Sequence, residues 1–436
     1  MPWLSITVLA PLLAAAVLLV VPAASKGAVR VLSALASLVS LWGAIEVGLA
    51  YNLYEGGIQL RETFPLVPSL GINWDLAVDG WGVSLLLLTG LILVAGVFAT
   101  WTLHDREKDF YILLLTLVAG VLGVFVSLDL FVFFLFYEIA VLPMYLLIGI
   151  WGSTKAVEVK GPFAFALRRL DVGGREYAAM KLTLMLLIGS AFILVGFFAL
   201  YQGGGSRDWG MLHLAQHPLS RDAQLWVFPA LWLGFGSLAG VFPFHTWSPD
   251  GHASAPTAVS MLHAGVLMKL GAFGVMRVGM VLCPEGAVAW APIVGAVAVI
   301  NVVYGALGAM GQTDLKYIVA YSSVSHMGIV MLGAATLSVD GWNGAVFQMF
   351  AHGLMTGLFF ALVGLVYGRA HDREIFRMGG FAKVMPGVAV FFTLAGLSSL
   401  GMPGFAGFIA EFLVFLGAWK SGHVAWALAG ILGAWI

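Results

Sequence analysis

Long apolar runs recur along almost the whole chain, and they constrain its fold more than any other feature. One of them, at 130–152, reads LFVFFLFYEIAVLPMYLLIGIWG. About 20 apolar residues at a rise of 1.5 Å per residue cross the hydrocarbon core of a bilayer. Only 10% of the 436 residues are charged, against about 25% in a soluble domain. The sequence therefore predicts a polytopic membrane protein, and the continuity of the runs predicts α-helices.

Thirteen of these runs are long enough to be candidate membrane spans. They fall at 3–22, 28–50, 82–103, 110–128, 130–151, 180–201, 224–243, 257–279, 288–309, 317–336, 342–367, 386–418 and 424–436. The first imitates a signal peptide, down to the small residues near Ala23, but it lacks a basic segment and is predicted to be a retained helix. The last reaches Ile436 without a polar tail, so we expect the chain to end inside a helix.

The basic residues predict an orientation for the chain. With the amino terminus outside, 15 of the 21 lysines and arginines fall in loops on the inner side, five on the outer side, and Lys269 inside a span. Basic residues concentrate in cytoplasmic loops, so the bias predicts an outer amino terminus. The net charge of −1 gives no indication of a nucleic-acid partner. The single cysteine, Cys283, excludes an internal disulfide, a thiolate-bound iron–sulfur cluster and Cys-ligated zinc within the chain.

Two of the runs are interrupted by glycine and proline. The run at 224–243 ends in GFGSLAGVFP, and the run at 386–418 contains LSSLGMPGFAG in its middle. Proline removes a backbone donor and clashes with the preceding turn. Unwound backbone at membrane depth persists only where protein or a wet cavity meets its polar groups. One interruption alone would favour an ordinary proline kink, whereas two, five spans apart, are typical of transporters with internal repeats.

Five ionisable side chains are predicted to lie well inside the spans. They are Glu138, Lys269, His326, His352 and Glu411. An ionised group at that depth costs several kcal/mol unless it has a partner, a wet cavity or a proton. Acids, a lysine and imidazoles on successive helices suit lateral proton transfer, because each takes up and releases a proton. This pattern makes the five side chains candidates for a proton pathway.

Plainer interpretations exist for the histidines. A lone histidine in a membrane helix is more often an interhelical hydrogen-bond partner, and His326, among three serines, fits that interpretation. His326 and His352 could instead ligate a haem axially. His245 and His252 flank Asp250 and could form a metal site, although a polar turn at the inner mouth is the stronger interpretation.

Several stretches resemble one known family. They are FYEIAVLPMYLLIGIWG (136–152), PFHTWSPDGHASAPTAVSMLHAGVLMKLGAFG (243–274), DLKYIVAYSSVSHMG (314–328) and GLSSLGMPGFAGFIAEF (396–412). They closely resemble M-type subunits of proton-pumping NADH:quinone oxidoreductase, the bacterial counterpart of mitochondrial NADH dehydrogenase subunit 4 in respiratory complex I. The resemblance implies an all-α, antiporter-like transmembrane bundle of fourteen helices. It also implies two inverted five-helix repeats in which helices 7 and 12 are discontinuous.

On this resemblance, the chain is a single transmembrane domain, 1–436. It would comprise N-terminal helices (1–103), a first repeat (104–282) and a second repeat (283–436) that ends within helix 13. No cofactor is expected in this chain, because the NADH, flavin, iron–sulfur clusters and quinone of such a complex belong to other subunits. The expected partners are the lipid bilayer and the other membrane subunits, especially neighbouring antiporter-like subunits, in the inner membrane of a bacterium.

The resemblance also implies roles for the buried ionisable residues. Glu138 matches the family's helix-5 glutamate, and Lys269 its central helix-8 lysine. His326 and His352 match the histidines between the half-channels. Glu411 matches a helix-12 residue that is glutamate in M-type subunits and usually lysine in the other antiporter-like subunits. Protons are then expected to enter from the inner side near 224–243 and 257–279, load Lys269, pass by His326 and His352 to Glu411, and leave outward.

The sequence departs from the family in two places. The family normally carries a lysine on helix 7 that pairs with the helix-5 glutamate, but that position here is near Leu238, and nothing from 225 to 241 is basic. We therefore expect Glu138, as an electrostatic switch, to pair with His263 or Lys269, or less strongly with His245. The inner loop at 153–178 is longer than usual and is a candidate docking segment for a neighbouring subunit.

Three alternatives remain open on the sequence. The chain could be an antiporter-like subunit of a sodium/proton antiporter or of a membrane-bound hydrogenase. It could be a haem- or quinone-binding redox anchor that uses His326 and His352. The missing helix-7 lysine also leaves open a structural spacer that has lost pumping.

Overall fold

The computed structural model describes residues 1–103, 105–154, 174–205 and 208–436. The longer helices are α1 (Trp3–Val20), α2 (Lys26–Ala50), α3 (Gly80–Ala99), α4 (Glu107–Val126), α5 (Leu130–Trp151), α7 (Arg175–Gly203), α9 (Arg221–Ala239), α13 (Pro284–Met310), α14 (Leu315–Ala335) and α15 (Val339–Ala370). The shorter helices are α8 (Met211–Gln216), α10 (Trp247–Ser254), α11 (Thr257–Leu262), α12 (Met268–Gly274), α16 (Phe381–Val384), α17 (Pro386–Ser399), α18 (Ala406–Lys420) and α19 (Val424–Trp435). The remaining elements are strands β1 (Gln59–Val67) and β2 (Ile72–Val78), 3-10 turns η1 (Pro68–Leu70), η2 (Phe244–Thr246) and η5 (Ile375–Arg377), and π-helical segments η3 (His263–Leu267) and η4 (Val275–Met280).

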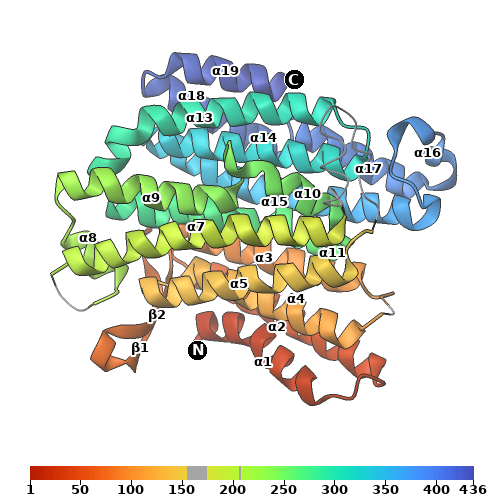
Figure 1. Cartoon of the computed structure of the whole chain (residues 1–436), viewed down its shortest axis with the longest axis horizontal. Helices are drawn as coiled ribbons and strands as arrows, with labels where there is room; N and C mark the ends of the chain where they lie inside the picture. The colour runs from red at the N-terminus through yellow and green to blue at the C-terminus, as the bar shows by residue number, and fades with distance from the viewer. Residues whose placement is uncertain (104, 155–173, 206–207) are drawn as a thin grey trace.

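The predicted polytopic helical bundle is confirmed. In the described part of the chain, 11 helical stretches are long and apolar enough to cross a membrane, and they match the first eleven predicted spans. The twelfth span consists of α17 and α18, and the thirteenth is α19. The helices lie side by side, with α1 and α2 along one edge of the bundle and α18 and α19 along the opposite edge (Figure 1).

The eighth membrane span, Thr257–Met280, is the most enclosed of the described spans. We call it helix 8, numbering the spans in chain order; it is distinct from the short helix α8. It runs continuously through α11, η3, α12 and η4, and its most apolar 18-residue window is 100% buried. Two π-helical segments interrupt the regular α-helix on either side of α12. Such segments are rare and occur frequently at functional sites.

A β-hairpin between α2 and α3 is the element that the sequence analysis missed. β1 pairs antiparallel with β2, from Gln59 opposite Val78 to Val67 opposite Ile72. Both Nε and Nη2 of Arg61 donate to the carboxylate of Asp75 at 2.7 Å. The hairpin and α8 lie at one end of the bundle, and α16 lies at the other end (Figure 1). The bundle is therefore helical in its spans, with a small sheet outside them.

Helix 7 is broken between α9 and α10, as the sequence predicts. Gly240 ends α9 with φ 75°, in the left-handed region that glycine tolerates. Asn301 on α13, which is fully buried, bonds the freed backbone. Its Oδ1 accepts from the backbone N–H of Phe242 at 2.8 Å, and its Nδ2 donates to the carbonyl of Gly240 at 3.3 Å. Nδ2 also donates to the carbonyl of Val324 on α14 at 2.8 Å, so Asn301 joins the break to α14.

Helix 12 is broken between α17 and α18, which confirms the second predicted interruption. Gly401 and Gly404 have φ of 64° and 102°. The backbone here bonds to itself, with Met402 N–H donating to Leu397 O at 3.2 Å and Phe405 N–H to Met402 O at 3.1 Å. The internal repeats implied by the resemblance stay a prediction. Most of the inner loop predicted at 153–178 lies outside the described residues.

Candidate functional site

Lys269 and His352 form a direct buried contact between helix 8 and α15. Lys269 lies on α12 with 0% exposure, and its Nζ is 2.6 Å from Nδ1 of His352. Nζ also donates to the carbonyl oxygen of Ala264 in the π-helical segment η3. An ammonium group at Lys269 can only donate, so in that form of the pair Nδ1 of His352 accepts and Nε2 carries the ring proton. Nε2 is buried and has no hydrogen-bond partner among the described residues.

His326, Gln348 and Glu411 form a second buried cluster beside the first. Gln348 on α15 places its Nε2 3.1 Å from Nδ1 of His326 and 3.4 Å from Oε1 of Glu411. His326 Nδ1 also lies 3.6 Å from Oε1 of Glu411, and its Nε2 faces Ser399 Oγ at 3.4 Å. Nδ1 of His326 therefore faces both the Gln348 amide and the Glu411 carboxyl, and Nε2 faces the Ser399 hydroxyl. All three residues of the cluster are at most 7% exposed.

The two clusters meet through their histidines. The rings of His326 and His352 lie 5.1 Å apart between centroids, with an interplanar angle of 46°. Lys269, His352, His326, Gln348 and Glu411 therefore follow one another through the interior, and we call this set the central polar line. The sequence analysis expected His326 before His352. The order is reversed: His352 on α15 contacts Lys269, whereas His326 on α14 lies beside Glu411.

Gln348 was not singled out from the sequence. Its side chain is neutral, so it does not belong to the series of ionisable residues inside the spans. Its spacing from His352 carried a signal, because residues four apart share one face of a helix. An amide within an apolar run, on the same helix face as a predicted buried histidine, therefore marks Gln348 as a candidate site residue from the sequence alone.

Glu138 does not belong to the central polar line. It lies on α5, and its Oε1 is buried without a hydrogen-bond partner among the described residues. The hydroxyl of Ser190 on α7 is its polar neighbour, but that oxygen is likewise without a bonded partner. The expected pairing of Glu138 with Lys269 is wrong, since the Lys269 ammonium is directed at His352 and Ala264.

His263 and His245 do not partner Glu138 either, so that expectation is also wrong. The ring of His263 packs against Trp247 and His252, with centroids 5.1 and 4.2 Å away. His245 stacks on Phe242 at 5.7 Å, beside the helix 7 break. No ring nitrogen of His263 or His245 has a hydrogen-bond partner in the described chain. Leu238, the position of the missing lysine, is a fully buried apolar side chain.

The haem and metal alternatives do not fit the geometry. His326 directs its two ring nitrogens at Gln348 and Ser399, which leaves neither for an axial bond. The carboxylate of Asp250 bonds Lys181 Nζ at 2.7 Å and the Tyr317 hydroxyl at 2.9 Å. In the described ranges, no group of three or more His, Cys, Asp or Glu side chains is arranged to hold a metal ion. The Asp250 carboxylate is thus bonded by a lysine and a tyrosine in a polar turn.

Glu411 borders open space at the second helix break. Two grooves of about 440 Å³ each flank its carboxyl group; one is also lined by His326 and Ser399, and the other by Gly401 and Trp419. A Cβ on Gly401 would lie 2.4 Å from Oε2 of Glu411, so only glycine fits beside this carboxyl. The break therefore brings the end of the central polar line to the edge of the described bundle.

The bundle, its two broken helices and the buried polar line define a polytopic membrane protein of the ion-translocating, antiporter-like class. Residues 127–436 match the family described as NADH:quinone oxidoreductase/Mrp antiporter, transmembrane. The chain belongs to this family.

Relatives and solved structures agree with this assignment. The chain is 39% identical over 423 residues to NAD(P)H-quinone oxidoreductase chain 4 2 of Thermosynechococcus vestitus, which covers 96% of this chain and 75% of the relative. It is 38% identical over 449 residues to NAD(P)H-quinone oxidoreductase chain 4 1 of a Synechococcus strain. This match covers 99% of this chain and 80% of the relative. A chain of respiratory complex I from Thermus thermophilus with bound NADH is 29% identical, with a TM-score of 0.86 and coverage of 99% and 85%. A chain of the Mrp complex from Dietzia shares the fold at 24% identity, with a TM-score of 0.85 and coverage of 99% and 77%.

Proposed function

We propose that this chain is a proton-translocating membrane subunit of a quinone-reducing oxidoreductase of the complex I type. The observation that carries the proposal is the central polar line, because it offers consecutive groups that donate and accept protons across the bundle interior. Every member is at most 7% exposed, which keeps bulk water and other ions away from the groups. The relatives named above as NAD(P)H-quinone oxidoreductase chain 4 support the enzyme assignment.

In the proposed route, a proton from the inner side loads Lys269. It passes to His352 through the 2.6 Å contact between Nζ and Nδ1. Transfer to His326 crosses the gap between two rings whose centroids are 5.1 Å apart, through a bridging water or a ring rotation. Gln348 contacts both His326 and Glu411 and holds them side by side. Glu411 then releases the proton toward the outer side.

Glu138 stands outside this route in our proposal. A carboxylate without a partner at membrane depth costs several kcal/mol, so the neutral form is the one that α5 accommodates. The switch role that the family resemblance implies needs a nearby base, and none of the described residues supplies one. We therefore propose that Glu138 supports the fold near Ser190 and carries none of the transported protons.

The orientation and the redox groups complete the proposal. The bias of basic residues toward alternate loops supports an amino terminus on the outer side of a bacterial inner membrane. NADH, flavin, iron–sulfur clusters and quinone would bind other subunits, and quinone reduction there would supply the energy. Neighbouring antiporter-like subunits would then be the partners of this chain.

The test is to replace Lys269 or Glu411 by alanine in the complete complex, reconstituted in vesicles. Proton uptake is measured against the rate of quinone reduction. We expect the number of protons per electron to fall about tenfold in both variants. Full coupled pumping in both would overturn the proposal. Sodium-dependent transport without NADH oxidation would identify an antiporter of the Mrp type instead.

A further inference from the structure

The inner end of α10 is bonded by two cations from the second half of the chain. Lys316, near the start of α14, donates from Nζ to the carbonyl oxygen of Ala255 at 2.5 Å. Arg373, in the loop after α15, donates from Nη1 to the carbonyl oxygen of Ala253 at 2.8 Å. Because the last carbonyls of a helix carry partial negative charge, cations stabilise them. We call Lys316 and Arg373 the inner clamp.

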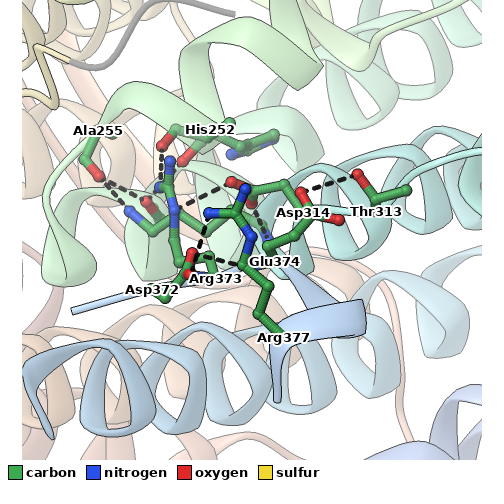
Figure 2. A network of polar contacts seen from close by, with 11 residues as sticks. His252, Ala255, Thr313, Asp314, Asp372, Arg373, Glu374 and Arg377 are labelled. Carbon is green, nitrogen blue, oxygen red and sulfur yellow. Dashed lines mark hydrogen bonds and ion pairs between the residues drawn. The ribbon is translucent and has the colours of Figure 1, made fainter. Parts of the chain in front are cut away.

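Arg373 is fixed in place by contacts with the start of α14. Its Nε lies 3.1 Å from Oδ2 of Asp314, and its carbonyl oxygen accepts from the N–H of Leu315 at 3.0 Å. Asp314 also forms an antiparallel β-bridge with Glu374. Figure 2 shows Arg373 between Asp314 and the segment that carries His252 and Ala255. Since the Arg373 side chain is only 11% exposed, solvent and salt screen this network weakly.

α10 lies directly against the residues that precede Lys269. His252 Nε2 and Ser248 Oγ are 3.4 and 3.7 Å from Sδ of Met268, the residue before Lys269. The ring of His252 also packs on that of His263, at the start of η3. A displacement of α10 therefore changes the surroundings of Lys269 on its inner side.

We propose that the inner clamp positions α10, and through it the loading site at Lys269. Lys316 and Arg373 contact the backbone of α10 and not Lys269, so they are positioning residues rather than members of the proton route. The clamp links the loop after α15 to helix 7 of the first half, and its loss would loosen α10 and uncouple loading from transfer. The consequence for transport rests on the proposed function, whereas the hold on α10 does not.

The test uses Arg373→Gln, with Arg373→Lys and Arg377→Gln beside it, in the complete complex in vesicles. Arg377 is a matched control, because it lies in the same loop with its side chain 76% exposed. Two quantities are measured: hydrogen exchange of the backbone amides of 247–256, and protons pumped per electron. We expect Arg373→Gln to raise exchange about tenfold and to lower protons per electron about fivefold. Arg373→Lys should restore most of both, and Arg377→Gln should change neither.

Two results would overturn the proposal. Unchanged exchange in 247–256 would show that the clamp does not hold α10. Faster exchange with unchanged protons per electron would show that its hold does not serve transport. If the unaltered complex pumps no protons, the proposed function fails, while the exchange data still decide the structural claim. If Arg373→Gln does not assemble, Asp314→Asn removes the anchor of Arg373 and is judged by the same two measurements.

Discussion

Glu138 and Glu411, the two acids that the sequence predicts inside the spans, occupy different surroundings: Glu411 is buried, whereas Glu138 is half-buried. Glu411 lies beside the break in helix 12, with the Gln348 amide 3.4 Å and the His326 imidazole 3.6 Å from its Oε1. Glu138 lies on the uninterrupted helix α5, and its Oε1 has no bonded partner among the described residues. A buried acid with donors around it can exchange a proton, whereas one without them is accommodated only as the neutral group. This difference is the reason that our proposal places transport in the second half and at Lys269.

The two helix breaks differ in a matching way. The break in helix 7 is bonded by Asn301, which comes from another helix and satisfies both a free N–H and a free carbonyl. The break in helix 12 bonds mostly within its own backbone, and Gly401 there leaves room for the Glu411 carboxyl. The first break is thus bonded by a side chain from another helix, whereas the second places Gly401 beside a buried acid.

The largest effect on this comparison is expected from His352→Leu. This change removes the only imidazole that contacts Lys269 in the described chain and divides the central polar line. Protons pumped per electron should fall about tenfold, because transfer out of Lys269 has then lost its acceptor. Proton uptake by vesicles with the complete complex measures it. His217→Leu, an exposed histidine outside the line, should behave as the unaltered complex; equal losses in both variants would contradict the account.

Gln348→Leu should have a smaller but clear effect. The leucine removes the amide that joins His326 to Glu411 while filling a similar volume. We expect protons per electron to fall about fivefold, with quinone reduction measured in the same vesicles. Gln348→Glu keeps the length of the side chain and introduces a carboxyl that can exchange protons. It should therefore retain more pumping than the leucine variant. Normal pumping by Gln348→Leu would remove this residue from the line.

Asn301→Leu should affect stability more than transport. It leaves the Phe242 N–H and the Gly240 carbonyl without their buried partner, at a cost of roughly 1–3 kcal/mol for each group. The melting temperature of the purified complex should drop, while protons per electron in the assembled fraction change by less than about twofold. Asn343→Leu, at an exposed asparagine, is the control. An unchanged melting temperature for Asn301→Leu would show that the first break does not depend on this side chain.

Ser190→Ala is expected to have the smallest effect. It removes a polar neighbour of Glu138 and leaves the central polar line intact. Protons per electron should stay within about twofold of the unaltered complex. A tenfold loss would place Glu138 in the transport route through Ser190 and would erase the contrast between the two acids.

The sequence predicted the features that depend on length and composition. The spans follow from the number of consecutive apolar residues, and the two breaks from Gly240 and Gly401 with their nearby prolines. Lys269 and Glu411 were found because a charge inside an apolar run is rare. The β-hairpin was missed because β1 has no regular alternation, with most of its residues exposed.

The partners of the site residues could not be predicted from the sequence. Which side chains meet depends on how each helix is rotated and which helix it packs against. His326 precedes His352 along the chain, yet His352 reaches Lys269, because α15 packs on helix 8. Asn301 and Gln348 were overlooked because their roles lie in hydrogen bonds to distant helices, which no local pattern records.

The most direct test of the central claim compares Glu411→Gln with Glu138→Gln in the same reconstituted complex. Glutamine keeps the shape of each side chain and removes its titratable proton. Protons pumped per electron should fall about tenfold in Glu411→Gln and stay within about twofold in Glu138→Gln. The reverse order, or equal losses in both variants, would contradict a proton route that runs through the second half and bypasses Glu138.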